Sequence, residues 1–123
     1  MNRNNSLLVA GLVLAAVTIG ASSRADAIGR IDYLTMNQAT ALPGVVLAPG
    51  TYGFEVVEGH ADIVRVTDRA TRRVLYLGFT DLVRRPEGSV NLLRFGEAPA
   101  GQAIPINAWF PIGATQGHAF RHR

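Results

Sequence analysis

The chain has 123 residues, 48% of them hydrophobic, with a formal net charge of +3 and no cysteine. This length suits one domain, and the absence of cysteine excludes disulfides and thiolate metal sites. Every cationic residue is an arginine, and acidic residues stand between the arginines. The chain therefore does not have the basic stripe with interleaved aromatic residues that is typical of nucleic-acid binding.

The N-terminal segment has the pattern of a secretory signal peptide. Arg3 precedes an uncharged apolar run, residues 7–19, and Ala25-Asp26-Ala27 forms a small-x-small cleavage site. The apolar part is shorter than the ~20 residues of a spanning helix, which favours cleavage over a retained anchor and predicts no stable membrane insertion afterwards. We expect residues 1–27 to be the signal peptide, residues 28–123 to be one domain, and the product to be periplasmic or secreted.

Short apolar runs, separated every 8 to 12 residues by Gly, Pro, Asp or Asn, predict an all-β domain. Residues 51–57 alternate apolar and polar side chains, which indicates one buried and one solvated face. No stretch of the domain has helical periodicity, so we expect little helix. The predicted fold is an antiparallel β-sandwich of about seven or eight short strands, jelly-roll or immunoglobulin-like in topology. The expected strands are 31–38, 45–47, 51–57, 63–67, 73–79, 90–95, 104–110 and 117–121.

Turn residues predict how several of these strands are connected. Pro49-Gly50 is typical of a type II turn, in which the glycine has a positive φ. Residues 62–79 are expected to form a hairpin with its tip at Asp68 to Arg72, and a five-residue connection of this kind often needs one residue in the left-handed region near its end. Pro86 and Gly88 favour a loop over residues 81–89.

Five segments of the chain resemble a group of small secreted bacterial proteins of unknown function. The resemblance covers nearly the whole predicted domain, and it implies no activity. Members of the group often have glycine near position 72, where this chain has Arg72. A looser likeness, confined to the Pro-Gly-Thr-Tyr turn, is to transthyretin-like and carboxypeptidase-regulatory-like β-sandwich modules, and it bears on fold alone. The segments are Leu42-Pro-Gly-Val-Val-Leu, Pro49-Gly-Thr-Tyr-Gly-Phe-Glu-Val, Ile63-Val-Arg-Val-Thr-Asp-Arg, Phe95-Gly-Glu-Ala-Pro-Ala-Gly and Ala108-Trp-Phe-Pro.

Residue types that usually carry catalysis or bind metals do not form a recognisable motif. Ser89, the only serine after residue 27, is not in a nucleophile-elbow sequence. His118 and His122 are four residues apart, which spans about 13 Å on a strand and is too far for one metal ion. Acidic pairs such as Glu55 and Glu58 are more typical of a solvated surface. We therefore predict no catalytic residues, no metal site and no cofactor.

Trp109 and Phe110 are adjacent in an expected strand, so their side chains should face opposite sides of the sheet. In a two-layer fold only one of them is expected to be buried. The other would then be an exposed aromatic side chain available for binding.

The meander of strands should bring the loop at residues 58–60 to the same end of the sheet as the loop at residues 81–87. Titratable and cationic side chains from both loops would meet there, whereas Arg72-Arg73 should lie at the opposite end. We expect an exported binding or interaction domain of the cell envelope, with an unknown protein or a small anionic ligand as partner. The alternatives are a small hydrolase or lyase that uses carboxylates and His60, or a structural envelope component. The predicted ligand-binding residues are Glu58, His60, Asp81, Arg84 and Arg85.

Overall fold

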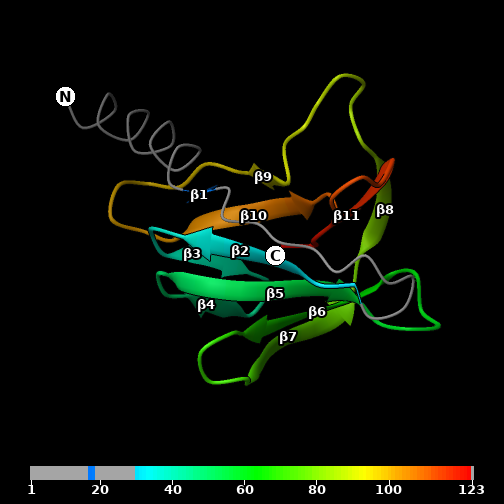
Figure 1. Cartoon of the computed structure of the whole chain (residues 1–123). Helices are drawn as coiled ribbons and strands as arrows, with labels where there is room; N and C mark the ends of the chain where they lie inside the picture. Colours follow the sequence, from blue (N-terminus) through cyan, green and yellow to red (C-terminus); the bar gives the residue numbers. More distant parts are fainter. Residues whose placement is uncertain (1–16, 19–29, 123) are drawn as a thin grey trace.

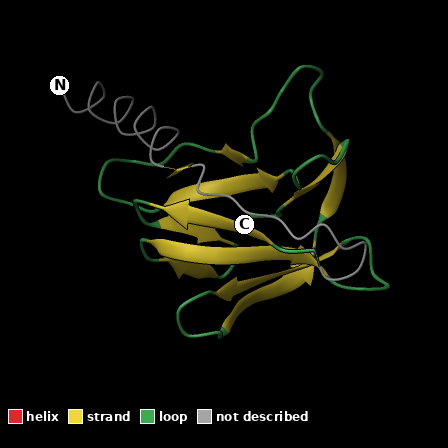
Figure 2. Ribbon diagram, in the orientation of Figure 1, coloured by secondary structure: helices red, strands yellow, loops and turns green. Residues whose placement is uncertain are grey.

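The computed structural model describes residues 17–18 and 30–122. Strands and loops make up the described residues, and two sheets face each other as the layers of a β-sandwich (Figures 1 and 2). The predicted all-β class is confirmed. No helix in the described part of the chain is long and apolar enough to cross a membrane. The predicted cleavage site, residues 25–27, lies outside the described residues.

The first sheet is antiparallel throughout, with the order β1-β2-β5-β6-β7. Successive side chains of a strand point to opposite faces of the sheet, so alternate residues share one face. Tyr52 and Phe54 on β5, and Val64 and Val66 on β6, are therefore all buried on the inner face. The two-residue strand β1 falls within the predicted signal peptide, so its removal would leave β2 at an edge. The strands are β1 (Val17–Thr18), β2 (Asp32–Met36), β5 (Gly50–Val56), β6 (Ile63–Asp68) and β7 (Val74–Phe79).

The second sheet has the order β4-β3-β10-β11-β8, and β9 also pairs with β10. Its pairs are antiparallel except that of β3 with β10, which is parallel. Pro105 lies at the start of β10, as the missing N–H of proline requires. The strands are β3 (Thr40–Leu42), β4 (Val45–Leu47), β8 (Asp81–Arg84), β9 (Leu93–Phe95), β10 (Ile104–Trp109) and β11 (Gln116–Ala119).

Of the two turns for which a residue with positive φ is predicted, one is confirmed and the other is wrong. Gly44, between β3 and β4, has φ of 78°. Gly50 does not have a positive φ; it is the first residue of β5, so the type II turn predicted at Pro49-Gly50 is wrong. In the β6–β7 hairpin, Arg72 has φ of 63°, which confirms the left-handed residue predicted there.

The segment at residues 81–84 is a strand and not part of a long loop. β8 follows β7 after a single residue, Thr80, and pairs with β11 of the second sheet. The chain thus passes from one sheet to the other at Thr80. Because of this crossing, Asp81 and Arg84 lie at the two ends of a strand of the second sheet.

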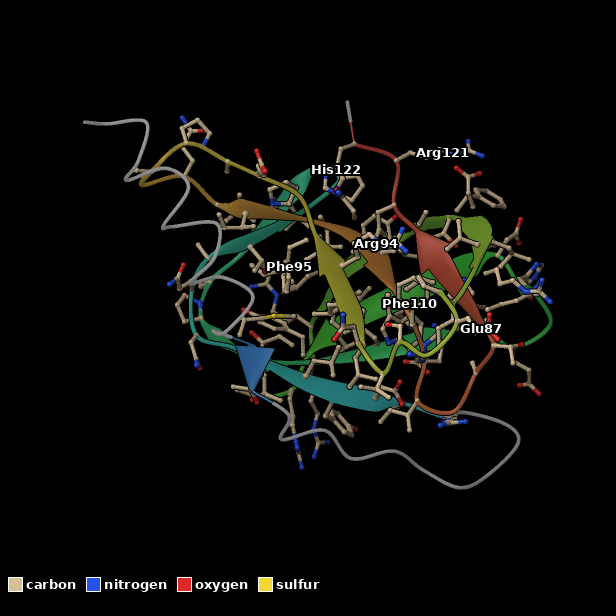
Figure 3. All side chains as sticks on the ribbon, turned by 90° about the horizontal axis from the view of Figure 1, so that it is seen from above. Glu87, Arg94, Phe95, Phe110, Arg121 and His122 are labelled. Carbon is tan, nitrogen blue, oxygen red and sulfur yellow. The ribbon has the colours of Figure 1, made fainter. Side chains whose placement is uncertain are left out.

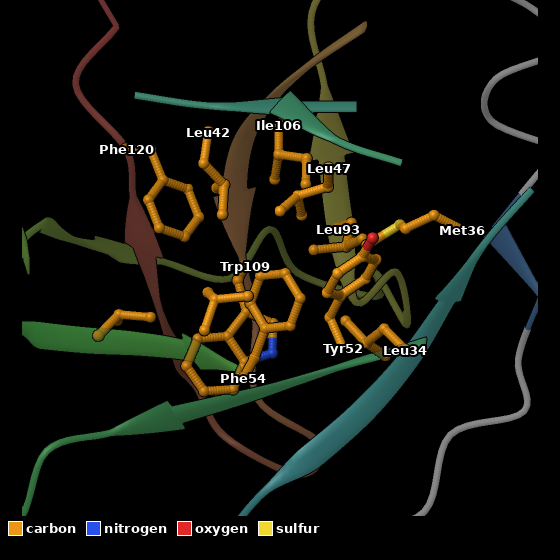
Figure 4. Close-up of a cluster of buried hydrophobic side chains, with 12 residues drawn as sticks. Leu34, Met36, Leu42, Leu47, Tyr52, Phe54, Leu93, Ile106, Trp109 and Phe120 are labelled. Carbon is orange, nitrogen blue, oxygen red and sulfur yellow. The ribbon is translucent and has the colours of Figure 1, made fainter. Parts of the chain in front are cut away.

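The inner faces of both sheets supply the hydrophobic core (Figure 4). Trp109 and Phe54 lie at its centre, with ring centroids 5.6 Å apart. Trp109 is the largest fully buried side chain. The buried cluster contains Leu34, Met36, Leu42, Leu47, Tyr52, Phe54, Val64, Val66, Leu93, Ile106, Trp109 and Phe120.

Phe110 is also buried, with 2% of its surface exposed, so the expectation that one member of the Trp109–Phe110 pair is exposed is wrong. Its ring is covered by two guanidinium groups, since Cζ of Arg85 lies 5.4 Å and that of Arg94 lies 5.1 Å from its centroid. Figure 3 shows Arg94 beside Phe110. Arg85, which directly follows β8, and Arg94 of β9 therefore cover the aromatic side chain that a simple two-layer fold would expose.

Candidate functional site

A cavity of about 400 Å³ opens at the end of the sandwich where β2 begins and β10 ends. We call it the end cavity. Its volume lies in the range of small-molecule sites. It is lined by Arg30, Asp32, Val56, Val57, Glu58, Gly59, His60, Ala61, Trp109 and Pro111.

Asp32 is the buried acidic residue of this cavity, with 1% of its surface exposed. Its Oδ2 accepts a hydrogen bond of 2.9 Å from the backbone N–H of Ile112. Its Oδ1 forms an ion pair with Nε of Arg30 at 3.9 Å, but this distance is too long for a hydrogen bond and the oxygen has no hydrogen-bond partner. A buried carboxylate oxygen without a hydrogen bond costs free energy unless another group reaches it.

Trp109 carries a second buried polar atom that lacks a hydrogen-bond partner. The indole Nε1 is buried and has no hydrogen-bond partner, although a buried tryptophan N–H usually finds one. One unmatched acceptor and one unmatched donor are thus present on two residues that line one cavity.

The ring of His118 supports Trp109 from β11. The two rings stack with centroids 5.4 Å apart and an angle of 25° between their planes. Nδ1 of His118 lies 3.2 Å from Oγ1 of Thr80, the residue at which the chain changes sheets. Burial lowers the pKa of His118 below its ordinary value of 6.5, and the charge of Asp62 opposes this shift. His118 is therefore neutral near pH 7, and it fixes the plane of the indole.

The loop after β10 is held from two sides, which fixes the mouth of the end cavity. On the cavity side, Arg30 donates to the carbonyl of Ile112, and Asp32 accepts from its N–H. On the other side, Arg85 donates to the carbonyls of Pro111 and Ala114, both at 2.8 Å. These contacts make the end cavity a preorganised feature of the fold.

The five predicted binding residues occupy three separate places. Glu58 and His60 line the end cavity. Asp81 accepts a hydrogen bond of 2.9 Å from Nε of Arg121, and this interaction lowers the pKa of Asp81 below its ordinary value. Arg84 and Arg85 line a second cavity of about 460 Å³ together with Glu87.

The expected convergence of these five residues is therefore wrong, and β8 supplies the physical reason. Asp81 stays near the start of β6, at the end of the sheet that carries the loop of residues 58–60, because Thr80 donates its N–H to the carbonyl of Asp62. Arg84 lies at the far end of β8, where it pairs with Gln116 of the second sheet. A strand rise of ~3.3 Å per residue separates the two ends by about 10 Å.

Arg85 has a structural role. Its guanidinium group donates to backbone carbonyls, including those of Asn91 at 2.9 Å and Pro111 at 2.8 Å, and it also covers the ring of Phe110. Arg84 is exposed and lies opposite Gln116. The arginine pair in the sequence thus separates into one structural and one exposed cation.

Asp32 and Trp109, the two residues with unmatched polar atoms, were not among the predicted binding residues. The sequence carries one signal for Asp32: it lies in phase with Leu34 and Met36, so it takes a core-facing position on β2. A charged residue at such a position is unusual and points to a special environment. For Trp109, the missing hydrogen bond follows only from the packing around it.

Comparison with protein-family models, with curated proteins and with solved structures finds no match to this chain.

Proposed function

We propose that this protein is an exported, non-enzymatic binding module and that its ligand site is the end cavity. One observation carries the proposal: Oδ1 of Asp32 and Nε1 of Trp109 are buried without hydrogen-bond partners, and both residues line this cavity. An unmatched buried polar group costs about 1 to 3 kcal/mol. A ligand that reaches both atoms recovers this cost as binding free energy.

The two atoms define the chemistry of the ligand. The carboxylate oxygen needs a donor, and the indole N–H needs an acceptor. A hydroxyl group offers both, and so do neighbouring hydroxyl and amide groups of a saccharide. We therefore favour a small, neutral, hydroxyl-rich ligand for the end cavity.

An anionic ligand is disfavoured in the end cavity, because the carboxylates of Asp32 and Glu58 line it and Arg30, the one arginine among the described lining residues, is already paired with Asp32. The small anionic ligand expected from the sequence is a separate proposal for the second cavity, where Arg84 is exposed. Glu87 lines the same cavity and weakens the attraction for anions there.

The test uses the exported protein with N-acetylglucosamine, which carries hydroxyls and one amide, and with acetate as the anionic comparison. Isothermal titration calorimetry of the wild type should show saturable binding of the sugar and none of acetate. Trp109→Phe removes the N–H but keeps an aromatic ring, and it should weaken sugar binding about tenfold or more.

Thr40→Val is the matched control. Oγ1 of Thr40 is the third buried polar atom without a hydrogen-bond partner in the described part of the chain, and Thr40 does not line the end cavity. Sugar binding should be unchanged in this variant. Equal loss in Thr40→Val and Trp109→Phe, or binding of acetate alone, would contradict the proposed site.

The alternative hydrolase or lyase would use the same cavity, because Glu58 and His60 line it along with Asp32. Incubation of the protein with a chromogenic N-acetylglucosaminide distinguishes the two functions. The binding proposal predicts no release of the chromophore above the rate seen with a Glu58→Gln, His60→Gln double variant. Release that this double variant abolishes would replace binding with catalysis.

A further inference from the structure

The strand β7 has an edge that no other strand of the described residues pairs with (Figure 1). Residues 74–80 are uncharged, and they are preceded by Arg73 and followed by Asp81. We propose that the exported protein forms a dimer through this edge, in which two copies of β7 pair antiparallel about a two-fold axis. The dimer involves a surface separate from the end cavity.

The register with β6 shows which backbone groups are free. Thr80 donates its N–H to the carbonyl of Asp62 at 2.7 Å, and Val64 lies opposite Gly78 two residues along. Hydrogen-bonded pairs alternate with non-hydrogen-bonded pairs in an antiparallel ladder. Gly78 and Thr80 therefore bond β6, while Leu77 and Phe79 direct their N–H and C=O groups to the edge. The carbonyl of Phe79 also accepts a hydrogen bond of 3.4 Å from the hydroxyl of Tyr76, so a partner strand would use the second lone pair of that oxygen.

The same two residues have exposed apolar side chains. Leu77 is 59% exposed and Phe79 is 64% exposed. They lie opposite Arg65 and Ile63 on the outer face of the sheet, whereas Tyr76 packs against the core. An edge strand with free backbone groups and exposed apolar side chains is a site for pairing with another strand.

A bulge limits the registers that this pairing allows. The register between β6 and β7 shifts between Val66 and Thr67, so the regular edge ends at Leu75, which packs against the core. The edge-facing N–H and C=O groups of Leu77 and Phe79 all find partners when Leu77 of one copy lies opposite Phe79 of the other. The two-fold axis then passes at Gly78, and two leucines and two phenylalanines form one apolar cluster.

Charge at the ends of β7 favours a second copy in this orientation. Antiparallel pairing places the Arg73 end of each strand beside the Asp81–Arg121 ion pair of the other and keeps the two Arg73 side chains apart, whereas parallel pairing would bring these two cations together. One strand thus offers both halves of a self-complementary surface, as an isologous dimer requires.

The first measurement is the mass in solution by sedimentation velocity over a concentration series of the exported protein. The wild type should shift from monomer to dimer as the concentration rises. Leu77→Lys places like charges beside the axis and should weaken the dimer about tenfold or more. Val46→Lys is the matched control, because Val46 is 62% exposed on β4, an edge strand of the other sheet, and this variant should dimerise as the wild type does.

Cysteine crosslinking tests the register, since the chain has no cysteine of its own. Hydrogen-bonded antiparallel partners have Cα atoms about 5.5 Å apart, within disulfide range. An equal mixture of Leu77→Cys and Phe79→Cys should therefore form a crosslinked dimer in higher yield than either variant alone.

Three results would overturn the inference. They are a wild type that is monomeric at every concentration, a dimer that Leu77→Lys and Phe79→Lys both leave intact, and crosslinking of each cysteine variant alone at the yield of the mixture. A monomer that retains sugar binding would remove the dimer and leave the end cavity in place. A dimer that does not bind sugar would remove the end cavity as the ligand site and leave the dimer in place.

Discussion

The ring of Phe110 fills the space that a side chain at Gly117 would need. A Cβ atom at position 117 would lie 2.2 Å from Cδ1 of Phe110 and 2.8 Å from the backbone oxygen of Trp109. The ring of Phe110 therefore packs in this position because residue 117 has no side chain. They hold the end of β10, from which Trp109 reaches the end cavity.

Gly117→Ala should lower the free energy of unfolding by about 3 kcal/mol, because the added Cβ would overlap both the buried ring of Phe110 and the backbone oxygen of Trp109. Urea denaturation measures the change. Gly50→Ala is the control, since a Cβ there would lie 3.4 Å from its nearest neighbour, and it should change stability much less. Similar losses in the two variants would show that Phe110 is not the cause.

Arg72→Gly should raise the free energy of unfolding by about 0.5 to 1 kcal/mol. Arg72 has φ of 63°, a left-handed conformation that costs residues other than glycine about 1 kcal/mol. Part of this gain is offset, because glycine also increases the entropy of the unfolded chain. A lower midpoint in urea for Arg72→Gly would mean that the arginine side chain stabilises the hairpin.

Thr40→Val should raise the melting temperature. The hydroxyl of Thr40 is buried without a hydrogen bond, and valine replaces it with a methyl group of similar size. The change removes an unmatched polar group worth about 1 kcal/mol. Calorimetry measures the shift, and a fall in melting temperature would show that the hydroxyl has a partner.

The stability of the protein should fall as the pH drops below 6.5. Burial lowers the pKa of His118 in the folded state, so between its folded value and 6.5 the unfolded chain binds more protons. The free energy of unfolding therefore rises with pH in that window and is lost as the pH falls through it. His118→Gln should remove this part of the slope, whereas the exposed His60→Gln should keep it; equal slopes for His118→Gln and the wild type would contradict the assignment.

Local patterns in the sequence were sufficient to predict most of the strands. The alternation of side chains over residues 51–57 predicts a strand with one buried face. The short polar connection at residues 68–72 predicts a hairpin turn with one left-handed residue. The change of sheet at Thr80 has no local pattern, because it depends on β8 finding β11. The predicted cluster failed for this reason, and only Glu58 and His60 of its members line the cavity that we propose as the site.

The most direct test of the central claim is the indole N–H signal of Trp109 in a ¹H–¹⁵N NMR spectrum. Trp109 is the only tryptophan, so the spectrum holds a single indole signal. Titration with N-acetylglucosamine should move this signal downfield and saturate, because the N–H gains a hydrogen-bond acceptor. An indole signal that stays unchanged while the sugar binds, or a protein that binds no sugar, would contradict a ligand site built on Asp32 and Trp109.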